Sequence, residues 1–236
     1  MSPLKREMNG RDKVERIPQA SQPEEAGNSE ILDEASQVAR GVLESIQALA
    51  GTTLVKGVQI HQLHKYAVSK GWLLSDVSRL GTYSDRGSEN EIYMSFDNRF
   101  VYKLNDFRYA DDNLTPFFER IYAHNILFKE CAYQMCGFAY NREGKFCALL
   151  RQPFILAERE ATPEEIEGEL GRMGFSSMLE GEYFTNGVYD IFDALPNNVL
   201  VDAGGQLFFI DTIIFRSDKD NPSTYHSLSP RTRSLR

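Results

Sequence analysis

The chain has few cysteines and histidines and no long apolar run. Its 236 residues include 3 cysteines (Cys131, Cys136 and Cys147) and 4 histidines, and no two cysteines have CxxC spacing. An odd number of cysteines without such spacing argues against a disulfide framework and a zinc site, and is typical of a reducing compartment. No stretch approaches the roughly 18 consecutive apolar residues of a transmembrane helix, and the polar N-terminus predicts no secretory signal. We therefore expect a cytoplasmic protein without a membrane partner.

Acidic residues outnumber basic ones, and the excess lies in the middle of the chain. The formal net charge is -8, from 26 Lys and Arg against 34 Asp and Glu. The segments 1–30 and 216–236 hold five basic residues each, which leaves residues 31–215 with 16 basic and 26 acidic residues. A body of this sign does not bind nucleic acid through charge alone. We expect no nucleic-acid partner.

Two helices are predicted near the N-terminus. From Ile31 apolar residues recur with helical spacing, Ser29 is placed as the N-cap, and Gly51 follows the expected end. A second helix is predicted over residues 58–69 and ends at Gly71. Residues before position 30 are polar, include prolines and show no apolar period, which predicts disorder.

Two further helices are predicted after residue 110. Residues 115–136 show helical periodicity. The expected buried stripe consists of Phe117, Phe118, Ile121, Ile126 and Leu127. Thr162 is a candidate N-cap for a helix that begins at Pro163 and continues with two glutamates.

The remaining patterns predict strands. Residues 89–96 and 99–106 are rich in aromatic and β-branched side chains, and an Asp-Asn pair between them predicts a hairpin turn. Residues 81–87 read as a turn-rich segment, and a strand is predicted up to Pro153. Residues 198–211 predict two strands joined by a tight Asp-Ala-Gly-Gly turn.

This last hairpin gathers oxygen ligands. Opposite residues of an antiparallel pair have a constant index sum, which is about 407 if the turn centres near Ala203–Gly204. Asn198 and Asp211 then lie almost opposite each other, and Asp193 precedes Asn198 by five residues. Three such oxygen donors suit Mg²⁺, which is usually shared with substrate phosphates. The alternative interpretation is a hairpin with ordinary polar ends.

The string IFDALPNNVLV resembles the catalytic loop of protein kinases and small-molecule kinases. Asp193, Pro196 and Asn198 match that pattern in order and spacing, and FFID resembles the strand that leads to the metal-binding aspartate, here Asp211. The resemblance implies that Asp193 orients the attacking hydroxyl and accepts its proton. It implies that Asn198 and Asp211 bind Mg²⁺.

The other parts of a kinase site occur upstream in the same order. Lys103, in FVYKL, has the place of the lysine that holds the α- and β-phosphates. Gly81 and Gly87 precede it, where a glycine-rich phosphate loop is expected. Glu119, in the next helix, is the candidate ion-pair partner of the lysine. Gln152, near the expected hinge, is a candidate nucleotide-binding residue.

A longer run of the chain is similar to the kinase domain found in polyvalent proteins of bacterial mobile elements. The matching strings extend from LHKYAVSKGWL through GSENEIY, VYKLND, HNILF, GFAY and RQPFI to the Asp193–Asp211 segment. The resemblance implies an α+β, protein-kinase-like two-lobed fold with ATP and Mg²⁺ as cofactors. Its expected parts are a disordered tail (1–29), an N-terminal helical extension (30–75), an N-lobe (76–153), a minimal helical C-lobe (154–216) and a flexible tail (217–236).

The expected function is phosphate transfer to an alcohol on a protein or small molecule, such as a host target of a mobile element. Several departures from the kinase pattern leave alternatives open. The glycines do not form GxGxxG, Ile191 and Phe192 stand where His-Arg is usual, and Thr212 and Ile213 replace the Phe-Gly of DFG. The alternatives are an active protein kinase, a small-molecule kinase, a pseudokinase that binds without turnover, and a purely structural protein. The small-molecule kinase predicts an acidic substrate pocket, and the structural protein predicts no nucleotide-dependent stabilisation.

Overall fold

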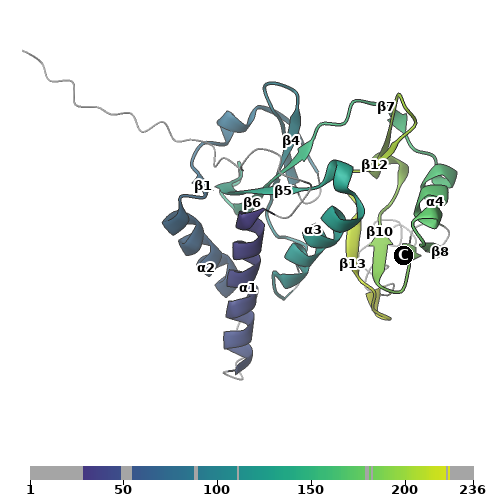
Figure 1. The fold of residues 1–236 in the computed structure, drawn as a ribbon. Helices are drawn as coiled ribbons and strands as arrows, with labels where there is room; N and C mark the ends of the chain where they lie inside the picture. Colours follow the sequence, from purple (N-terminus) through teal and green to yellow (C-terminus); the bar gives the residue numbers. More distant parts are fainter. Residues whose placement is uncertain are drawn as a thin grey trace, which may run out of the picture.

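The protein mixes helices with three β-sheets, so it belongs to the α+β class (Figure 1). The computed structural model describes residues 29–48, 55–87, 90–110, 112–178, 181, 183–221 and 223. Gly51, residues 1–28 and residues 224–236 lie outside this set, and with them the predictions of both terminal tails.

The first two helices pack on each other and against the largest sheet. Helix α1 (Glu30–Ala48) contacts α2 (Val55–Lys70) and strand β5 (Gln134–Tyr140). Ser29 is the predicted N-cap of α1: its Oγ accepts from the Leu32 N–H at 3.2 Å and donates to the Met135 carbonyl at 3.0 Å. The cap therefore also attaches the helix to the sheet.

The largest sheet has six strands in the order β1-β5-β6-β4-β3-β2. Its other strands are β1 (Leu73–Leu74), β2 (Thr82–Arg86), β3 (Asn90–Met94), β4 (Phe100–Asn105) and β6 (Phe146–Pro153). The strands predicted around Asp97-Asn98 and before Pro153 are confirmed. The interpretation of 81–87 as turn-rich was wrong, because β2 pairs with β3 along most of that segment.

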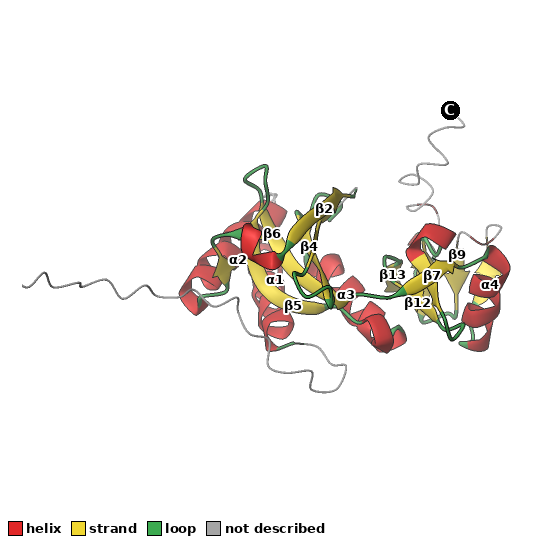
Figure 2. Ribbon diagram, turned by 90° about the horizontal axis from the view of Figure 1, so that it is seen from above, coloured by secondary structure: helices red, strands yellow, loops and turns green. Residues whose placement is uncertain are grey.

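Helix α3 (Thr115–Leu127) lies between the six-stranded sheet and the C-terminal strands (Figure 2). The predicted helix over 115–136 was too long. After Leu127 the chain forms a 3-10 turn (Lys129–Cys131) and then β5, whose pairing with β6 overrides the helical pattern. Ile126, predicted to be buried, is 54% exposed.

The C-terminal part is built from short strands with one capped helix, α4 (Pro163–Arg172). The strands are β7 (Ala157–Glu160), β8 (Ser176–Met178), β9 (Tyr183–Thr185), β10 (Tyr189–Phe192), β11 (Val199–Asp202), β12 (Leu207–Phe209) and β13 (Ile213–Arg216). They form two sheets, β13-β10-β9-β8 and β12-β11-β7. The prediction of a mainly helical C-terminal lobe was wrong, because these segments are too short for helices and pair with one another.

The cap of α4 was predicted correctly. The Thr162 Oγ1 accepts from the Glu165 N–H at 3.3 Å, and the Glu165 carboxylate accepts from the Thr162 N–H at 2.9 Å. This reciprocal capping box satisfies two of the unpaired donors at the helix start. The same carboxylate binds Arg159 of β7 at 2.7 Å, which attaches the helix to the neighbouring sheet.

One hydrophobic core joins helix α3 to the strands of the C-terminal part. Ala123 at the end of α3 and Phe128 just beyond it pack in one cluster with Ile191 of β10, Val199 of β11 and Phe209 of β12. The end of α3 therefore belongs to the core of the C-terminal part as well as to the sheet before it. In the part of the chain that the structure describes, every helix is too short or too polar to cross a bilayer.

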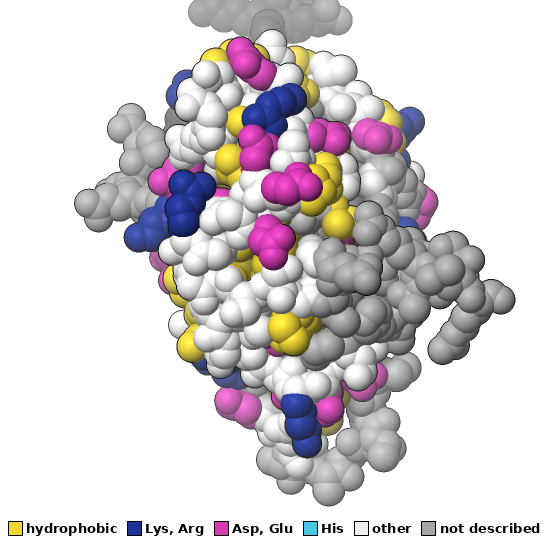
Figure 3. All heavy atoms as spheres, turned by 90° about the vertical axis from the view of Figure 1, so that its right-hand side faces the viewer, with side chains coloured by type: hydrophobic (Ala, Val, Ile, Leu, Met, Phe, Trp, Pro, Cys, Tyr) yellow, Lys and Arg dark blue, Asp and Glu magenta, His cyan; other side chains and the backbone are white. Residues whose placement is uncertain are grey.

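The surface beside α4 is acidic. Figure 3, which views the molecule from the α4 side, shows acidic side chains over the upper part of that face with Lys and Arg between them. Helix α4 itself carries Glu164, Glu165, Glu167 and Glu169 against a single Arg172.

Replacing Gly81 with alanine is expected to destabilise the protein by about 1–3 kcal/mol. A Cβ at Gly81 meets the Met94 carbonyl oxygen at 1.8 Å, and the backbone there has a φ of 142°. The matched control is Gly168→Ala, since Gly168 lies inside α4 with nothing within 4 Å of its Cβ position. This control should gain about 0.5–1 kcal/mol of helix stability. Urea unfolding measures both, and a tolerated Gly81→Ala contradicts the predicted clash.

Candidate functional site

The pairing of β11 with β12 places Asn198 beside the end of β12. Val199 pairs with Phe209, so the index sum is 408, one away from the predicted 407. The pairing continues for one more residue, because the Ile210 N–H donates to the Asn198 carbonyl at 2.9 Å. Asn198 and Asp211 are therefore neighbours across the strand ends, as the sequence predicted.

A second pairing brings Asp193 to the same place. Strand β10 pairs with β13, and their last partners are Phe192 and Ile213. The next residues outward are Asp193 and Thr212, so Asp193 lies across the ladder from the residue that follows Asp211. Strand β13 was not predicted from the sequence, because no local pattern reveals a pairing between such distant segments.

The loop between β10 and β11 is held by its own side chains. Asp193 has a positive φ of 57°, and Pro196–Asn198 form a 3-10 turn. The Asn198 Nδ2 donates to the Asp193 carbonyl at 2.9 Å, and the Asn197 Nδ2 donates to the Asn198 Oδ1 at 2.9 Å. The Asn198 amide is fixed in orientation by these bonds, and its oxygen retains a second lone pair.

Lys103 contacts this cluster from the six-stranded sheet. It lies in the middle of β4, and its side chain is only 7% exposed. Its Nζ donates to the Asp211 Oδ1 at 3.3 Å, the Ile210 carbonyl at 2.9 Å and the Tyr133 hydroxyl at 3.2 Å. The structure thus places Lys103 in contact with Asp211, and the two strand pairings place the backbones of Asn198 and Asp193 near Asp211.

The ion pair keeps both of its groups charged. Burial by itself lowers the pKa of Lys103, but the negative charge of Asp211 and the bonds to Tyr133 raise it above its ordinary value. Burial likewise raises the pKa of Asp211, and the charge of Lys103 overcomes this and holds that pKa below its usual range. The Asp211 side chain is still 49% exposed, so its carboxylate remains accessible to a ligand.

Glu119 is not the acidic partner of Lys103, which corrects the sequence prediction. Glu119 is exposed on α3, and the ion pair that the structure gives Lys103 is with Asp211. The residues of α3 that face the lysine are Phe117, Arg120, Ile121 and His124. They recur with helical spacing, and Glu119 lies outside that stripe. The helical spacing of the apolar residues could therefore have shown that Glu119 points away from the lysine.

The two predicted loop glycines lie at opposite ends of β2. Gly87 is at the β2–β3 turn, and its N–H donates to the Asn90 carbonyl at 2.9 Å to close the hairpin. Gly81 precedes β2 at the other end, pressed against the backbone of Met94 and Ser95. This close approach explains why position 81 is a glycine. Because the two glycines lie at opposite ends of β2, the interpretation that both belong to one phosphate loop was wrong.

Gln152 is used inside the protein. Its Nε2 donates to the Cys131 carbonyl at 2.7 Å, and the residue is 3% exposed. The bond attaches β6 to the turn after α3. This buried role differs from the predicted contact with a nucleotide. Its hydrogen-bond partner is the backbone of a residue 21 positions away, so no local pattern in the sequence indicates it.

A small cavity of about 40 Å³ lies beside the Lys103–Asp211 pair, with room for a water molecule but not for a nucleotide. Two buried atoms of its lining residues, the His124 Nδ1 and the Thr212 Oγ1, have no hydrogen-bond partner among the described residues. The other ring nitrogen of His124 donates to the Phe209 carbonyl at 2.9 Å. Burial lowers the pKa of His124 to about 4, so the ring is neutral at physiological pH.

Asp190 is a carboxylate with a structural role. It is fully buried on β10 and accepts hydrogen bonds from two parts of the chain. The donors are Tyr183, Thr185, Ser217, the backbone of Asp218, and Asn221. Burial raises the pKa of Asp190, but these bonds outweigh it and hold that pKa below its usual range. The residue thereby anchors the segment that follows β13.

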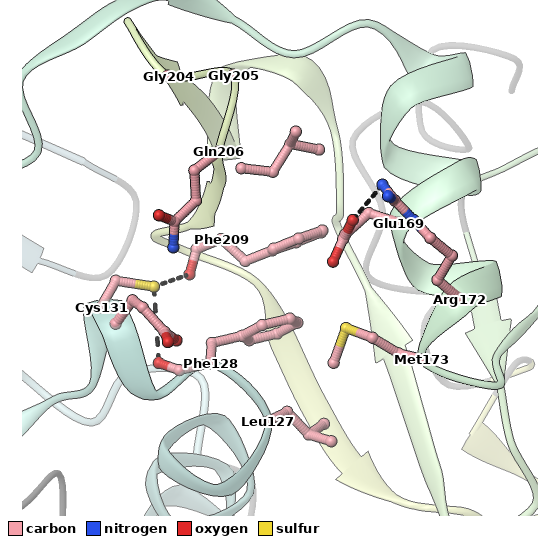
Figure 4. A pocket seen from close by; sticks show the side chains of 12 residues that line it. Leu127, Phe128, Cys131, Glu169, Arg172, Met173, Gly204, Gly205, Gln206 and Phe209 are labelled. Carbon is pink, nitrogen blue, oxygen red and sulfur yellow. Dashed lines mark hydrogen bonds and ion pairs between the residues drawn. The ribbon is translucent and has the colours of Figure 1, made fainter.

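A larger hollow of about 400 Å³ lies elsewhere, between the end of α3, α4 and the β11–β12 turn (Figure 4). Phe128 and Phe209 stack in it with ring centroids 4.4 Å apart. Its walls include Leu127, Cys131, Glu169, Arg172, Met173 and Gln206. It contains none of the predicted site residues.

The donors at the strand ends fit a magnesium ion. Asn198 offers an amide oxygen and Asp211 a half-exposed carboxylate, both hard oxygen ligands of the kind Mg²⁺ prefers. Among the described residues no three His, Cys, Asp or Glu side chains form a metal cluster. A magnesium ion here would complete its shell with phosphate and water oxygens, as is usual for this ion.

Comparison with known protein families identifies a matching family model. The model of a family described as "Serine/Threonine/Tyrosine Kinase found in polyvalent proteins" matches residues 56–218, which is more than half of the chain. The match includes Lys103, Asp193, Asn198 and Asp211. No curated protein matches the sequence.

Asp211→Asn is expected to destabilise the protein at neutral pH by about 1–2 kcal/mol, less than for a fully buried pair because Asp211 is half exposed. Since the folded-state pKa of Asp211 is lowered, its contribution is present above the unfolded pKa of about 3.9 and is lost as pH falls through the folded value. The gap to wild type in urea unfolding should therefore close toward pH 3. Glu119→Gln removes an exposed acid and should change little. An equal loss in both variants contradicts the assignment of Asp211 as the partner of Lys103.

Proposed function

We propose, from the premise that the chain belongs to the family of serine/threonine/tyrosine kinases found in polyvalent proteins, that it transfers the γ-phosphoryl group of ATP to an alcohol. In this proposal the six-stranded sheet with α3 is the N-lobe of a kinase-like fold, and the sheets after Pro153 are a small C-lobe. One observation carries the proposal: the β11–β12 and β10–β13 pairings and the Lys103 side chain all meet near Asp211. These bring Asn198, the Asp193 backbone and the lysine to one place.

Each residue of the cluster has a role that its environment supports. Lys103 is charged and buried, and its ammonium would hold the α- and β-phosphates. Asn198 and Asp211 would hold Mg²⁺, which would supply positive charge to neutralise the phosphates. Lys103 would exchange its bond to Asp211 for a bond to a phosphate oxygen, which would leave the carboxylate available as a metal ligand.

Asp193 is the group we assign to the acceptor. Its carboxylate would orient the attacking hydroxyl and take up the proton that the hydroxyl loses as the new P–O bond forms. The positive φ of Asp193 and the bond from Asn198 to its carbonyl fix the backbone from which this carboxylate projects. The family description supports a serine, threonine or tyrosine hydroxyl as acceptor, and we propose a protein target in the host of a mobile element.

A pseudokinase that binds nucleotide without turnover is the second candidate. One observation favours it: the three bonds made by the Lys103 ammonium all go to the protein itself, through Asp211, Ile210 and Tyr133. Nucleotide binding has to replace one of them. Binding and turnover are therefore tested separately.

ATP and Mg²⁺ together are expected to raise the unfolding temperature, and either alone should do so less. A ligand at a hundredfold excess over its Kd stabilises the folded state by about 2.7 kcal/mol. Asp211→Ala should lose the part of the shift that requires Mg²⁺, because it removes a proposed metal ligand. Glu119→Gln, the exposed acid of α3, should keep the whole shift. No shift in the wild-type protein at millimolar ATP contradicts nucleotide binding.

Asp193→Asn is expected to keep the shift with ATP and Mg²⁺ but to lower phosphate transfer by roughly 100-fold or more, because it removes the proton acceptor. Transfer is measured as labelled phosphate appearing on the protein itself or on a mixture of candidate proteins. The control is Asp202→Asn in the β11–β12 turn, which should leave transfer unchanged. A wild-type protein that binds ATP without any transfer favours the pseudokinase.

A further inference from the structure

The ammonium of Lys103 has one neutral side-chain partner. Its three acceptors are the Asp211 carboxylate, the Ile210 carbonyl and the hydroxyl of Tyr133. If Asp211 turns to a metal when nucleotide binds, as the proposed function requires, the bonds to Ile210 and Tyr133 are the ones that remain. Of these two only the tyrosine is a side chain.

The Tyr133 hydroxyl bridges the lysine and the backbone before Asp211. It lies 3.2 Å from the Lys103 Nζ, 3.1 Å from the Ile210 carbonyl and 3.4 Å from the Asp211 Oδ1. Because an ammonium only donates, the phenol oxygen accepts from Lys103 and gives its own proton to Ile210 or Asp211. A neutral hydroxyl can accept and donate at once, which a carboxylate cannot.

Helix α3 holds Tyr133 in place through Asn125. The Tyr133 N–H donates to the Asn125 Oδ1 at 2.7 Å, and the Asn125 Nδ2 donates to the Tyr133 carbonyl at 2.7 Å. Asn125 is only 4% exposed. The ring of Tyr133 also packs on His124, with centroids 4.6 Å apart. Backbone and ring are therefore both fixed by consecutive residues of α3.

We propose that Tyr133 is a positioning residue for Lys103, and that α3 acts on the lysine through the Asn125–Tyr133 clamp instead of through an acidic side chain. This inference rests on the proposed phosphate transfer. It is independent of Glu119, which is exposed. The clamp connects the end of α3 to the phosphate-holding group through neutral side chains, so it adds no negative charge to a site that has to accept an anionic nucleotide.

Tyr133→Phe tests the inference because it removes only the hydroxyl. With one fewer acceptor the lysine is less constrained, and we expect kcat/KM for ATP to fall roughly 10-fold to 100-fold, as for a lost hydrogen bond to a charged group. The Kd of ATP–Mg²⁺ should rise in calorimetry. Binding of adenosine, which has no phosphates, should not change. In a Lys103→Met background Tyr133→Phe should have no further effect on ATP affinity, because the lysine through which it acts is gone.

Tyr183→Phe is the matched control. The Tyr183 residue is buried, and its hydroxyl donates to a carboxylate, Asp190, at 3.1 Å. This pair lies in the sheet that contains β9 and β10. Both variants should lose similar unfolding free energy, whereas only Tyr133→Phe should weaken ATP binding. Asn125→Asp keeps the acceptor for the Tyr133 N–H and loses the donor, so it should give a smaller loss of the same kind, and it serves if Tyr133→Phe fails to fold.

The outcomes separate the two proposals. A wild-type protein that binds no ATP–Mg²⁺ overturns the proposed function, and the role of Tyr133 with it. A wild-type protein that binds ATP–Mg²⁺ while Tyr133→Phe binds it equally well overturns only the role of Tyr133. A loss of affinity that is the same for ATP and adenosine, or that persists in the Lys103→Met background, also overturns that role, since it indicates a general structural effect.

Discussion

The buried ammonium of Lys103 is the constraint on which the arrangement of the two parts of the molecule depends. A charged group that is 7% exposed requires acceptors, and these come from Asp211, from the backbone just before it, and from Tyr133. The lysine and Asp211 are 108 positions apart. Satisfying the lysine therefore fixes the end of β12 against the six-stranded sheet. The Phe209 carbonyl adds neutral links, since it accepts from His124 at 2.9 Å and from the Cys131 thiol at 3.2 Å.

The short strand β13 has a large effect for its four residues. By pairing with β10 it brings Asp193 to the side of Asp211, and it also packs against α3. The segment after it is then held by the buried Asp190. A C-terminal part made mostly of short strands can in this way bring Asp193, Asn198 and Asp211 to neighbouring strand ends.

Helix α3 contributes positive and neutral groups to the site. Arg120 and His124 line the cavity beside Lys103, and the charge of Arg120 helps to hold the pKa of Asp211 low, after the stronger effects of burial and of Lys103. The acid that pairs with Lys103 is Asp211 itself. The cations Lys103 and Arg120 beside this half-exposed carboxylate attract an anionic ligand, in a molecule whose α4 face is acidic.

Features that depend only on neighbouring residues were predictable from the sequence. Capping side chains and turn residues act within a few positions, so the starts of α1 and α4 and the register of the β11–β12 hairpin were predictable, the last to within one position. The order of Lys103, Asp193, Asn198 and Asp211 along the chain was also readable. Contacts between distant segments determined which groups meet. They set the end of α3 before the turn that leads to β5, the pairing of β13, the close approach that requires Gly81, and the choice of Asp211 and Tyr133 over Glu119 as partners of Lys103. These depend on contacts between distant segments and on the rotation of a helix about its axis, and the energies of such contacts outweigh local preference.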